Sequence, residues 1–194
     1  EYYDSEYGET LKIITHYVSE IDCIKSNAKT ATMYGYVRPN IDSSHEHSFI
    51  NTQEIRHPII ERINTETNYV PNDVKIGINN DITGMLLFGT NASGKSSLMK
   101  AVGLNIIMAQ AGFYVSAKNF IYNPYNYLFT RINNNDNIFK GESSFAVEMM
   151  ELRNILKRSN SNSLILGDEL CSGTESISAL SIFAASVKYL SKIN

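Results

Sequence analysis

The stretch GTNASGKSSLMKAVGL, from Gly89 to Leu104, is the most informative part of this sequence for its fold. Residues 89–96 fit the pattern G-x-x-x-x-G-K-[ST] at each fixed position. Glycines let backbone N–H groups approach phosphate oxygens without a Cβ in the way, and a helix that starts near Gly94 adds the positive end of its dipole. Lys95 would place an ammonium on the β- and γ-phosphates, and the Ser96 hydroxyl would bind Mg²⁺. The stretch therefore predicts a nucleotide phosphate site.

A glycine turn before a surface helix is the alternative explanation of the same residues. The flanking residues favour the phosphate site, because the apolar run Met85–Phe88 precedes the loop and predicts a short buried strand. After the loop, Lys95–Ala111 predicts a helix with one apolar face, made of Leu98, Val102, Ile106 and Ala109. A strand, a glycine loop and a helix in this order are the context that the motif requires.

A second feature is the pair of carboxylates that follows the apolar run Leu164–Leu166. Asp168, at the tip of this predicted strand, could hold Mg²⁺ through water beside the phosphate loop. Glu169 would then orient and polarise the attacking water as a general base. A solvated turn after a strand is the alternative, and the glycine loop upstream favours the catalytic interpretation. A kinase must exclude water from its site, so a base at Glu169 points to ATP hydrolysis.

Between these two features lies the segment KGESSF, from Lys140 to Phe145. A glycine followed by hydroxyls at the start of a helix is another arrangement that binds phosphate. Taken alone, Ser143 or Ser144 is better explained as a plain N-cap.

The rest of the chain predicts strands alternating with helices, and therefore an α/β sheet covered on its faces. A helix is expected over Thr10–Tyr34, where apolar residues recur at three- and four-residue steps until Gly35 and Pro39 end it. Further helices are expected over Ser144–Lys157 and Ser176–Lys192. The other expected strands are Phe49–Ile55, Val74–Ile78, Phe113–Val115, Phe120–Tyr122 and Tyr127–Ile132, followed by a polar loop over Asn133–Lys140.

Composition narrows the class of protein. Of the 194 residues, 43% are hydrophobic and 19% charged, which favours a packed core over disorder. A net charge of −3 argues against nucleic-acid binding by this chain alone. Its cysteines, Cys23 and Cys171, match no zinc spacing, and no apolar run has membrane-spanning length. We therefore expect a soluble intracellular protein with no membrane partner, whether nuclear, cytoplasmic or in a viral factory. The first residue is Glu, which predicts a fragment of a longer protein.

Taken together, these residues resemble the ATPase domain of the MutS family of DNA mismatch-repair proteins, which belongs to the ABC-type ATPases. The resemblance covers nearly the whole chain in the order of the family's motifs. It is carried by TNASGKSSLMKAVGLNIIMAQAGFYVSA, LFTRI, KGESSFAVEM and LILGDELCSGT, and upstream by IRHPIIE, YVPND and IDCIKSNAKTATMYGYVRP. The Asn-rich sequence is also similar to the MutS homologues of large DNA viruses.

The resemblance implies an α/β fold, a P-loop NTPase of the ABC-ATPase type with a mixed sheet flanked by helices. A short N-terminal helical segment, residues 1–40, would be the end of the lever or connector region. Residues 41–194 would form the ABC-type ATPase domain, incomplete at its C-terminus. The implied cofactors are ATP or ADP with Mg²⁺. The implied partners are a second MutS-like subunit, forming a homodimer, and mismatched double-stranded DNA bound through domains outside this chain.

The family also implies a role for each matching residue. Tyr69 would stack on adenine, and Ser143 would reach the γ-phosphate of the nucleotide bound to the partner subunit. Glu169, Lys95 and Ser143 would be catalytic, and Ser96 and Asp168 would bind the metal. The nucleotide would also be bound by the loop and the start of its helix, at Gly89, Asn91, Ala92, Ser93, Gly94, Lys95, Ser96 and Ser97. Arg56 and His57 match the family's RHP segment, and we assign them structural roles first.

The sequence departs from the family in several places. Ser143-Ser144 stands where Ser-Thr is common, and Cys171-Ser172-Gly173-Thr174 lacks the basic residue of the usual Gly-Arg-Gly-Thr. The family's next strand, with its switch histidine, is not in this sequence, which predicts that the chain by itself is weakly active or inactive.

The sequence is also compatible with two alternatives to a mismatch-repair ATPase. One is a recombination or chromosome-structure ATPase of the same superfamily, which the RHP and YVPND segments argue against. The other is an assembly module that uses ATP only to dimerise, and Glu169 argues against it because such a module needs no hydrolytic base.

Overall fold

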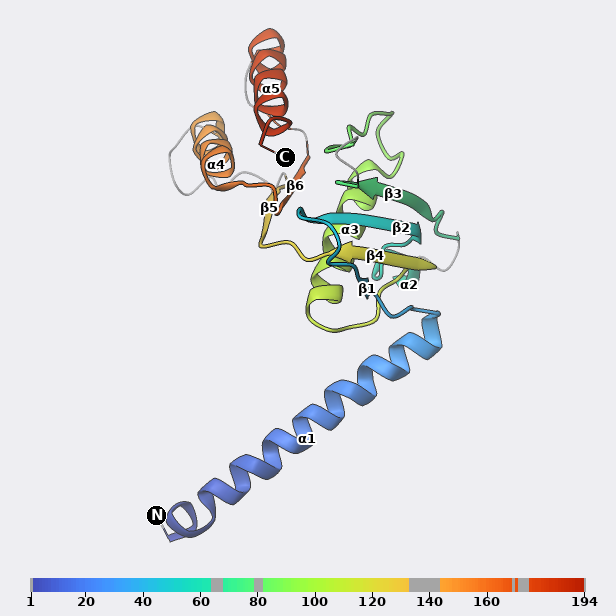
Figure 1. Ribbon diagram of the computed structural model, residues 1–194, viewed down its shortest axis with the longest axis vertical. Helices are drawn as coiled ribbons and strands as arrows, with labels where there is room; N and C mark the ends of the chain where they lie inside the picture. Colours follow the sequence, from blue (N-terminus) through green and yellow to red (C-terminus); the bar gives the residue numbers. More distant parts are fainter. Residues whose placement is uncertain are drawn as a thin grey trace.

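The computed structural model describes residues 2–63, 68–78, 82–132, 144–168, 170 and 175–193. A long helix, α1 (Tyr2–Tyr34), projects from a body that contains a four-stranded sheet and a separate two-stranded sheet (Figure 1). Helix α3 (Lys95–Gln110) follows the glycine loop and belongs to the body.

The four-stranded sheet has the order β1-β4-β2-β3. Strand β1 runs parallel to β4, whereas β2 pairs antiparallel with both β4 and β3. Its core contains Ile50, Ile55, Val74, Phe120 and Tyr122, each no more than 1% exposed, packed with residues of α3. The bounds are β1 Asn40–Ile41, β2 Phe49–Ile55, β3 Asn72–Ile76 and β4 Asn119–Asn123, with the short helix α2 (Ile60–Ile63) between β2 and β3.

The two-stranded sheet pairs β5 (Tyr127–Arg131) with β6 (Ser163–Gly167) in parallel. Helix α4 (Ser144–Arg158) contacts β5, and α5 (Ser176–Leu190) contacts α4. Strand β6 packs against α3. The two elements are so close that a Cβ on Gly103 would lie 2.7 Å from Leu166 Cδ1. Helix α3 therefore packs against both sheets, which explains why residues around much of its circumference are buried: Met99, Ala101, Val102, Gly103, Asn105, Ile106 and Ala109.

Asn162 joins the two sheets through hydrogen bonds at the start of β6. Its Oδ1 accepts a hydrogen bond from the backbone N–H of Ser48, which precedes β2, at 2.9 Å. Its backbone carbonyl accepts one from the N–H of Asn126, just before β5, at 2.8 Å. The Ser48 hydroxyl donates to the carbonyl of Pro124, in the connection from β4 to β5, at 2.5 Å. The turn before β6 is thereby fixed to the four-stranded sheet.

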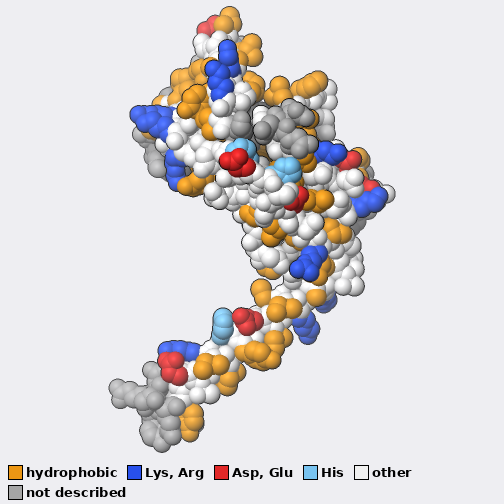
Figure 2. All heavy atoms as spheres, in the orientation of Figure 1, with side chains coloured by type: hydrophobic (Ala, Val, Ile, Leu, Met, Phe, Trp, Pro, Cys, Tyr) orange, Lys and Arg blue, Asp and Glu red, His pale blue; other side chains and the backbone are white. Residues whose placement is uncertain are grey.

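Helix α1 contacts the body only near its C-terminal end among the described residues. The backbone N–H of Tyr114 donates to Asn27 Oδ1 at 3.2 Å, and Val37 and Val115 exchange backbone hydrogen bonds of 3.0 and 2.9 Å. Along the rest of α1 hydrophobic side chains are exposed, as Figure 2 shows; they include Leu11, Ile14, Tyr17, Val18, Ile21 and Ile24. No helix within the described ranges is long and apolar enough to cross a membrane.

The expected fold, one mixed sheet flanked by helices in an ABC-type P-loop NTPase, is wrong for the part of the chain that the structure describes. The strands form two separate sheets. Met85–Phe88, predicted as a buried strand, pairs with neither sheet, and the side chains of Leu86 and Phe88 are 69% and 90% exposed. Without backbone partners this apolar run cannot form a strand that connects the sheets. The N-terminal helical segment is also not short, because α1 spans 33 residues.

The other elements agree with the sequence more closely. Strand β2 and the starts of α3, α4 and α5 lie where they were predicted. The strand expected over Phe113–Val115 is only the isolated bridge at Val115, and α1 begins at Tyr2 instead of Thr10. The loop expected over Asn133–Lys140 lies outside the described residues. The division between residues 1–40 and 41–194 stays a prediction.

Candidate nucleotide site

The glycine loop, residues 89–94, ends in a backbone conformation that suits glycine. Gly94 has φ 92° and ψ 8°, in the left-handed region, and it is the N-cap of α3 without a side-chain capping bond. The turn therefore leads the chain directly into α3, and no side chain occupies the amino end of the helix as its cap. Unpaired N–H groups and the positive dipole end at such a helix start favour an anion.

The Lys95 side chain folds back over the glycine loop and bonds to its backbone. Its Nζ donates to the carbonyl oxygens of Gly89 and Thr90 at 2.8 and 2.7 Å. An ammonium has three N–H donors, and these two bonds use two of them. The ammonium is thus held at the loop where the sequence predicts phosphate.

The remaining predicted loop residues lie around this lysine. Asn91, Ala92 and Ser93 are exposed in the turn, and the Ser93 N–H donates to the Thr90 carbonyl at 3.3 Å. A Cβ on Gly89 would come within 3.0 Å of the Ser93 hydroxyl oxygen, so the glycine allows the close turn. Ser96 and Ser97 lie half-buried in the first turn of α3. The structure therefore brings the predicted residues 89–97 together as one accessible loop and helix start.

Asp168 continues β6, because its N–H donates to the Arg131 carbonyl at 2.8 Å. Gly103 of α3 faces Leu166, and Lys100, nearer the start of α3, lines a pocket with the carboxyl end of β5. The carboxyl ends of β5 and β6 thus lie toward the amino-terminal half of α3, the half that carries Lys95. Among the described residues no hydrogen bond or ion pair joins Asp168 to Lys95 or Ser96.

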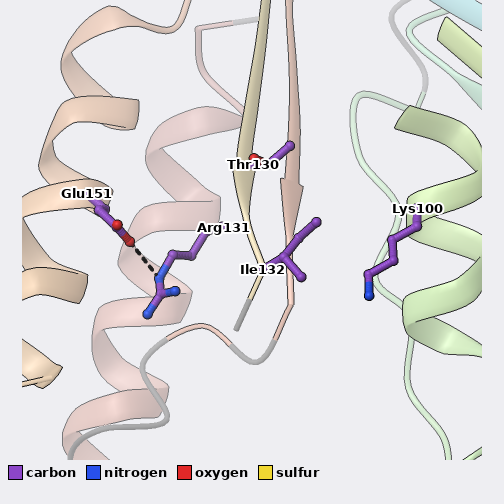
Figure 3. Close-up of a pocket in the computed structure, with 5 residues that line it drawn as sticks. All are labelled: Lys100, Thr130, Arg131, Ile132 and Glu151. Atoms are coloured by element: carbon purple, nitrogen blue, oxygen red, sulfur yellow. Dashed lines mark ion pairs between the residues drawn. The ribbon is translucent and has the colours of Figure 1, made fainter. Parts of the chain in front are cut away.

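The pocket beside these strand ends has a volume of about 370 Å³. Figure 3 shows Lys100 extending from α3 on one side, while Arg131 points to the other side toward Glu151 of α4. Arg131 Nε and Glu151 Oε2 are 2.9 Å apart, so the arginine is paired with a carboxylate. Thr130 and Ile132 complete the lining. The sequence predicts the strand over Tyr127–Ile132 but does not indicate this pocket, because its lining residues lie far apart in the chain.

Tyr69, predicted to stack on adenine, lies half-buried beside the RHP segment. Burial is the main cause that raises the pKa of Tyr69, the negative charge of Glu61 adds to this effect, and the nearby backbone of His57 opposes it. His57 itself is 5% exposed, and its Nδ1 accepts hydrogen bonds from the N–H groups of Ile59 and Ile60, both at 3.2 Å. Burial lowers the pKa of His57, and the positive charge of Lys100 adds to this effect. His57 is a packed, hydrogen-bonded residue, as the sequence analysis expected.

Two predicted catalytic residues, Ser143 and Glu169, lie outside the described residues, as do Cys171–Thr174. The roles of both catalytic residues therefore stay predictions.

Comparison with known proteins gives the family. The model of MutS domain V matches residues 85–194. The chain is 41% identical to a DNA mismatch repair mutS homologue of Acanthamoeba polyphaga mimivirus, over 98% of this chain and 20% of that protein. It is 40% identical to the mitochondrial DNA mismatch repair mutS homologue of Sarcophyton glaucum, over 95% and 19%. It is 35% identical to DNA mismatch repair protein MutS of Staphylococcus aureus, over 96% and 21%.

The chain belongs to the MutS family. It spans about a fifth of the length of these curated relatives. The domain V match contains the glycine loop, the pocket and Asp168, whereas Arg56, His57 and Tyr69 precede it. These three residues lie in the part of the chain that only the longer alignments with MutS relatives cover.

The glycine loop has the geometry that a nucleotide phosphate chain requires. The left-handed Gly94, the close approach at Gly89 and the placed ammonium of Lys95 fit a phosphate chain. Within the described ranges no group of three or more His, Cys, Asp or Glu residues could hold a metal ion. A magnesium site of Ser96 and Asp168 would therefore depend on phosphate oxygens and water for its other ligands.

Proposed function

We propose that this chain is the ATP-binding and ATP-hydrolysing part of a MutS-like DNA mismatch-repair protein. The observation that carries the proposal is the glycine loop, in which Gly94 opens α3 in a left-handed turn and Lys95 is held at the loop carbonyls. The two loop carbonyls use two of the three N–H donors of this ammonium, which leaves one donor and the positive charge for an anion at the loop. Membership of the MutS family supports the connection to mismatch repair.

In this proposal Lys95 donates to the β- and γ-phosphates, and the N–H groups at the start of α3 bind phosphate oxygens. Ser96 and Asp168 would hold Mg²⁺, which neutralises phosphate charge when it is bound. Glu169 would accept a proton from the attacking water, and Tyr69 would stack on adenine. Ser143 would act in the site of a second MutS-like subunit, so that ATP joins two subunits. Through this ATP-driven dimerisation, nucleotide would be coupled to recognition of mismatched DNA by other domains.

Binding is tested first, by titration calorimetry with Mg-ATP. Lys95→Ala removes charge-assisted hydrogen bonds of about 1.5–3 kcal/mol, so the Kd should rise roughly 10- to 100-fold. The matched control is Lys75→Ala, which removes one exposed lysine from β3 and should leave the Kd unchanged. Equal affinity in wild type and Lys95→Ala would show that the glycine loop does not bind the phosphates.

Dimerisation is tested by light scattering on the Glu169→Gln chain with and without Mg-ATP. A change from monomer to dimer is expected, because this variant should bind ATP without hydrolysing it. An unchanged mass at saturating ATP would refute a site shared between subunits. Turnover measured on a full-length parent protein separates an ATPase from an assembly module. If wild type and Glu169→Gln are equally inactive while ATP still dimerises both, the assembly module is favoured.

A further inference from the structure

The two-stranded sheet of β5 and β6 is held by different contacts at its start and at its carboxyl end. At the start, Asn162 bonds to Ser48 and Asn126, which fixes the turn before β6 to the four-stranded sheet. A two-stranded sheet is only marginally stable by itself in water, so the position of each end depends on its neighbours. The carboxyl end matters for the proposed function because Asp168, a proposed Mg²⁺ ligand, directly follows β6.

Arg131 holds this carboxyl end through its backbone. In the parallel register of the two strands Arg131 is the partner of Gly167, the last residue of β6. The Arg131 carbonyl oxygen accepts a hydrogen bond from the N–H of Asp168 at 2.8 Å. The backbone of Asp168, from which its carboxylate extends, is therefore positioned by the backbone of Arg131.

The side chain of Arg131 joins the same point to α4. Arg131 Nε and Glu151 Oε2 are 2.9 Å apart, and the Arg131 side chain is only 18% exposed. Near Glu151 on α4, Leu152 and Ile155 are buried, and apolar packing of this kind is non-directional. The ion pair adds a contact between two specified atoms. It therefore fixes α4 and the end of β5 at one relative position, which apolar packing alone does not.

The guanidinium of Arg131 is turned away from the helix that carries the candidate nucleotide loop. In Figure 3 Lys100 extends from α3 on one side of the pocket, whereas Arg131 points to the opposite side, toward α4. Lys95 and Ser96 lie at the start of the same helix as Lys100. A guanidinium that points away from this helix and is paired with a carboxylate is arranged to hold the strand end and not to bind a phosphate.

We propose that Arg131 is a positioning residue whose ion pair with Glu151 holds the carboxyl end of β5, and thereby Asp168, where this carboxylate reaches Mg²⁺ bound with ATP. The inference rests on the proposed nucleotide binding and adds the contact that places one of its metal ligands. Arg131 itself touches neither the nucleotide nor the metal. Loss of a residue that orients a metal ligand typically lowers metal affinity about 10- to 100-fold.

The experiment measures by titration calorimetry how much Mg²⁺ strengthens the binding of AMPPNP, a non-hydrolysable form of ATP. The Kd is determined in excess Mg²⁺ and again in excess EDTA, and the ratio of the two values isolates the contribution of the metal. In the native chain Mg²⁺ should lower the Kd, because the metal joins Ser96 and Asp168 to the phosphates. Lys95 and the glycine loop bind phosphate without the metal, so they determine the Kd in EDTA.

Arg131→Gln should raise the Kd in Mg²⁺ about tenfold and keep the Kd in EDTA within about twofold of the native value. Glu151→Gln leaves Arg131 without its charged partner and should give the same pattern with a smaller rise. It also serves if Arg131→Gln folds poorly, because Glu151 is 49% exposed. Arg131→Lys keeps the charge without the planar fork and should restore part of the affinity. The matched control is Arg153→Gln, at an exposed position of α4, which should change neither Kd.

The outcomes distinguish this inference from the proposed function. A purely structural role for Arg131, or a direct contact with phosphate, would change the Kd in Mg²⁺ and in EDTA together. That result, or a native Kd in Mg²⁺ for Glu151→Gln, overturns the positioning role and leaves nucleotide binding in place. If Mg²⁺ does not strengthen binding by the native chain, the metal role of Asp168 is wrong and the inference with it. If the native chain binds no nucleotide in either condition, the proposed function itself is wrong.

Discussion

Replacing Asn105 by Ala tests whether the centre of this fold depends on one buried amide. The side chain is completely buried and bonds to three residues: Arg56, Ala101 and Ser116. After truncation the Arg56 carbonyl still accepts from the Ser116 hydroxyl at 2.8 Å, and the Ala101 carbonyl keeps its place in the helix. Only the Ser116 N–H loses its acceptor among the described residues.

The magnitude follows from these partners. A buried N–H left without an acceptor costs about 1–3 kcal/mol, and the space left by the amide adds about 1 kcal/mol. We therefore expect Asn105→Ala to lower the free energy of unfolding by about 2–4 kcal/mol. With a urea m-value of roughly 2 kcal/mol/M, the unfolding midpoint should fall by about 1–2 M.

Urea unfolding followed by circular dichroism measures this shift. The control is Asn72→Ala, because Asn72 is exposed and, among the described residues, its amide bonds only to the nearby Val70 carbonyl, at 3.1 Å. The control should change the free energy by no more than about 0.5 kcal/mol. A midpoint shift for Asn105→Ala as small as that of the control would refute the assignment of Asn105 as the link between α3 and Arg56.

Three further predictions concern other parts of the body. Gly94→Ala should cost about 1–2 kcal/mol of stability and weaken Mg-ATP binding in calorimetry, because the backbone φ of Gly94 is 92°. The control is Gly84→Ala, which should change neither stability nor binding because a Cβ at Gly84 would meet open space. Burial lowers the folded-state pKa of His57 below 6.5, so as pH falls the unfolded state takes up a proton before the folded state does. The stability that neutral His57 contributes is therefore complete above about pH 6.5 and is lost as pH falls. Thermal melts from about pH 7.5 to 5 should show a smaller loss of stability in His57→Gln than in the wild type. Asn162→Ala should lower the free energy of unfolding by about 1–3 kcal/mol in urea titrations, since the part-buried Ser48 N–H loses its acceptor.

Local elements could be predicted from the sequence because their signals are local. The signals for β2 and for the apolar face of α3 lie in neighbouring residues, and both elements lie where the sequence placed them. The run Met85–Phe88 shows the limit of such signals. Four apolar residues predict a buried strand, but a strand also needs a neighbour with free backbone groups, and periodicity does not identify one. The sheet topology was therefore predicted wrongly although most of its strands were predicted well.

The same distinction applies to the candidate site. The loop from Gly89 to Ser97 could be predicted because its chemistry lies in consecutive residues, and the structure brings these residues together. The position of Asp168 relative to α3 depends on a parallel strand pair and on the packing of Gly103 against Leu166. The sequence predicted the strand that carries Asp168, and only the packing shows on which half of α3 the strand ends.

The hydrogen bonds of Arg56 could not be predicted from motif and periodicity alone, because they join residues far apart in the chain. Asn105 and Arg56 are 49 positions apart, and Arg56 reaches back 22 positions to Tyr34. One signal was present: Asn105 is a polar residue in the apolar segment VGLNIIM, and a buried amide must have partners. This signal predicts that the asparagine forms hydrogen bonds. It does not identify the partner, because several backbone carbonyls could accept a bond from the amide. That the partner is Arg56, whose side chain also donates to the Tyr34 carbonyl at the end of α1, is a property of the tertiary packing.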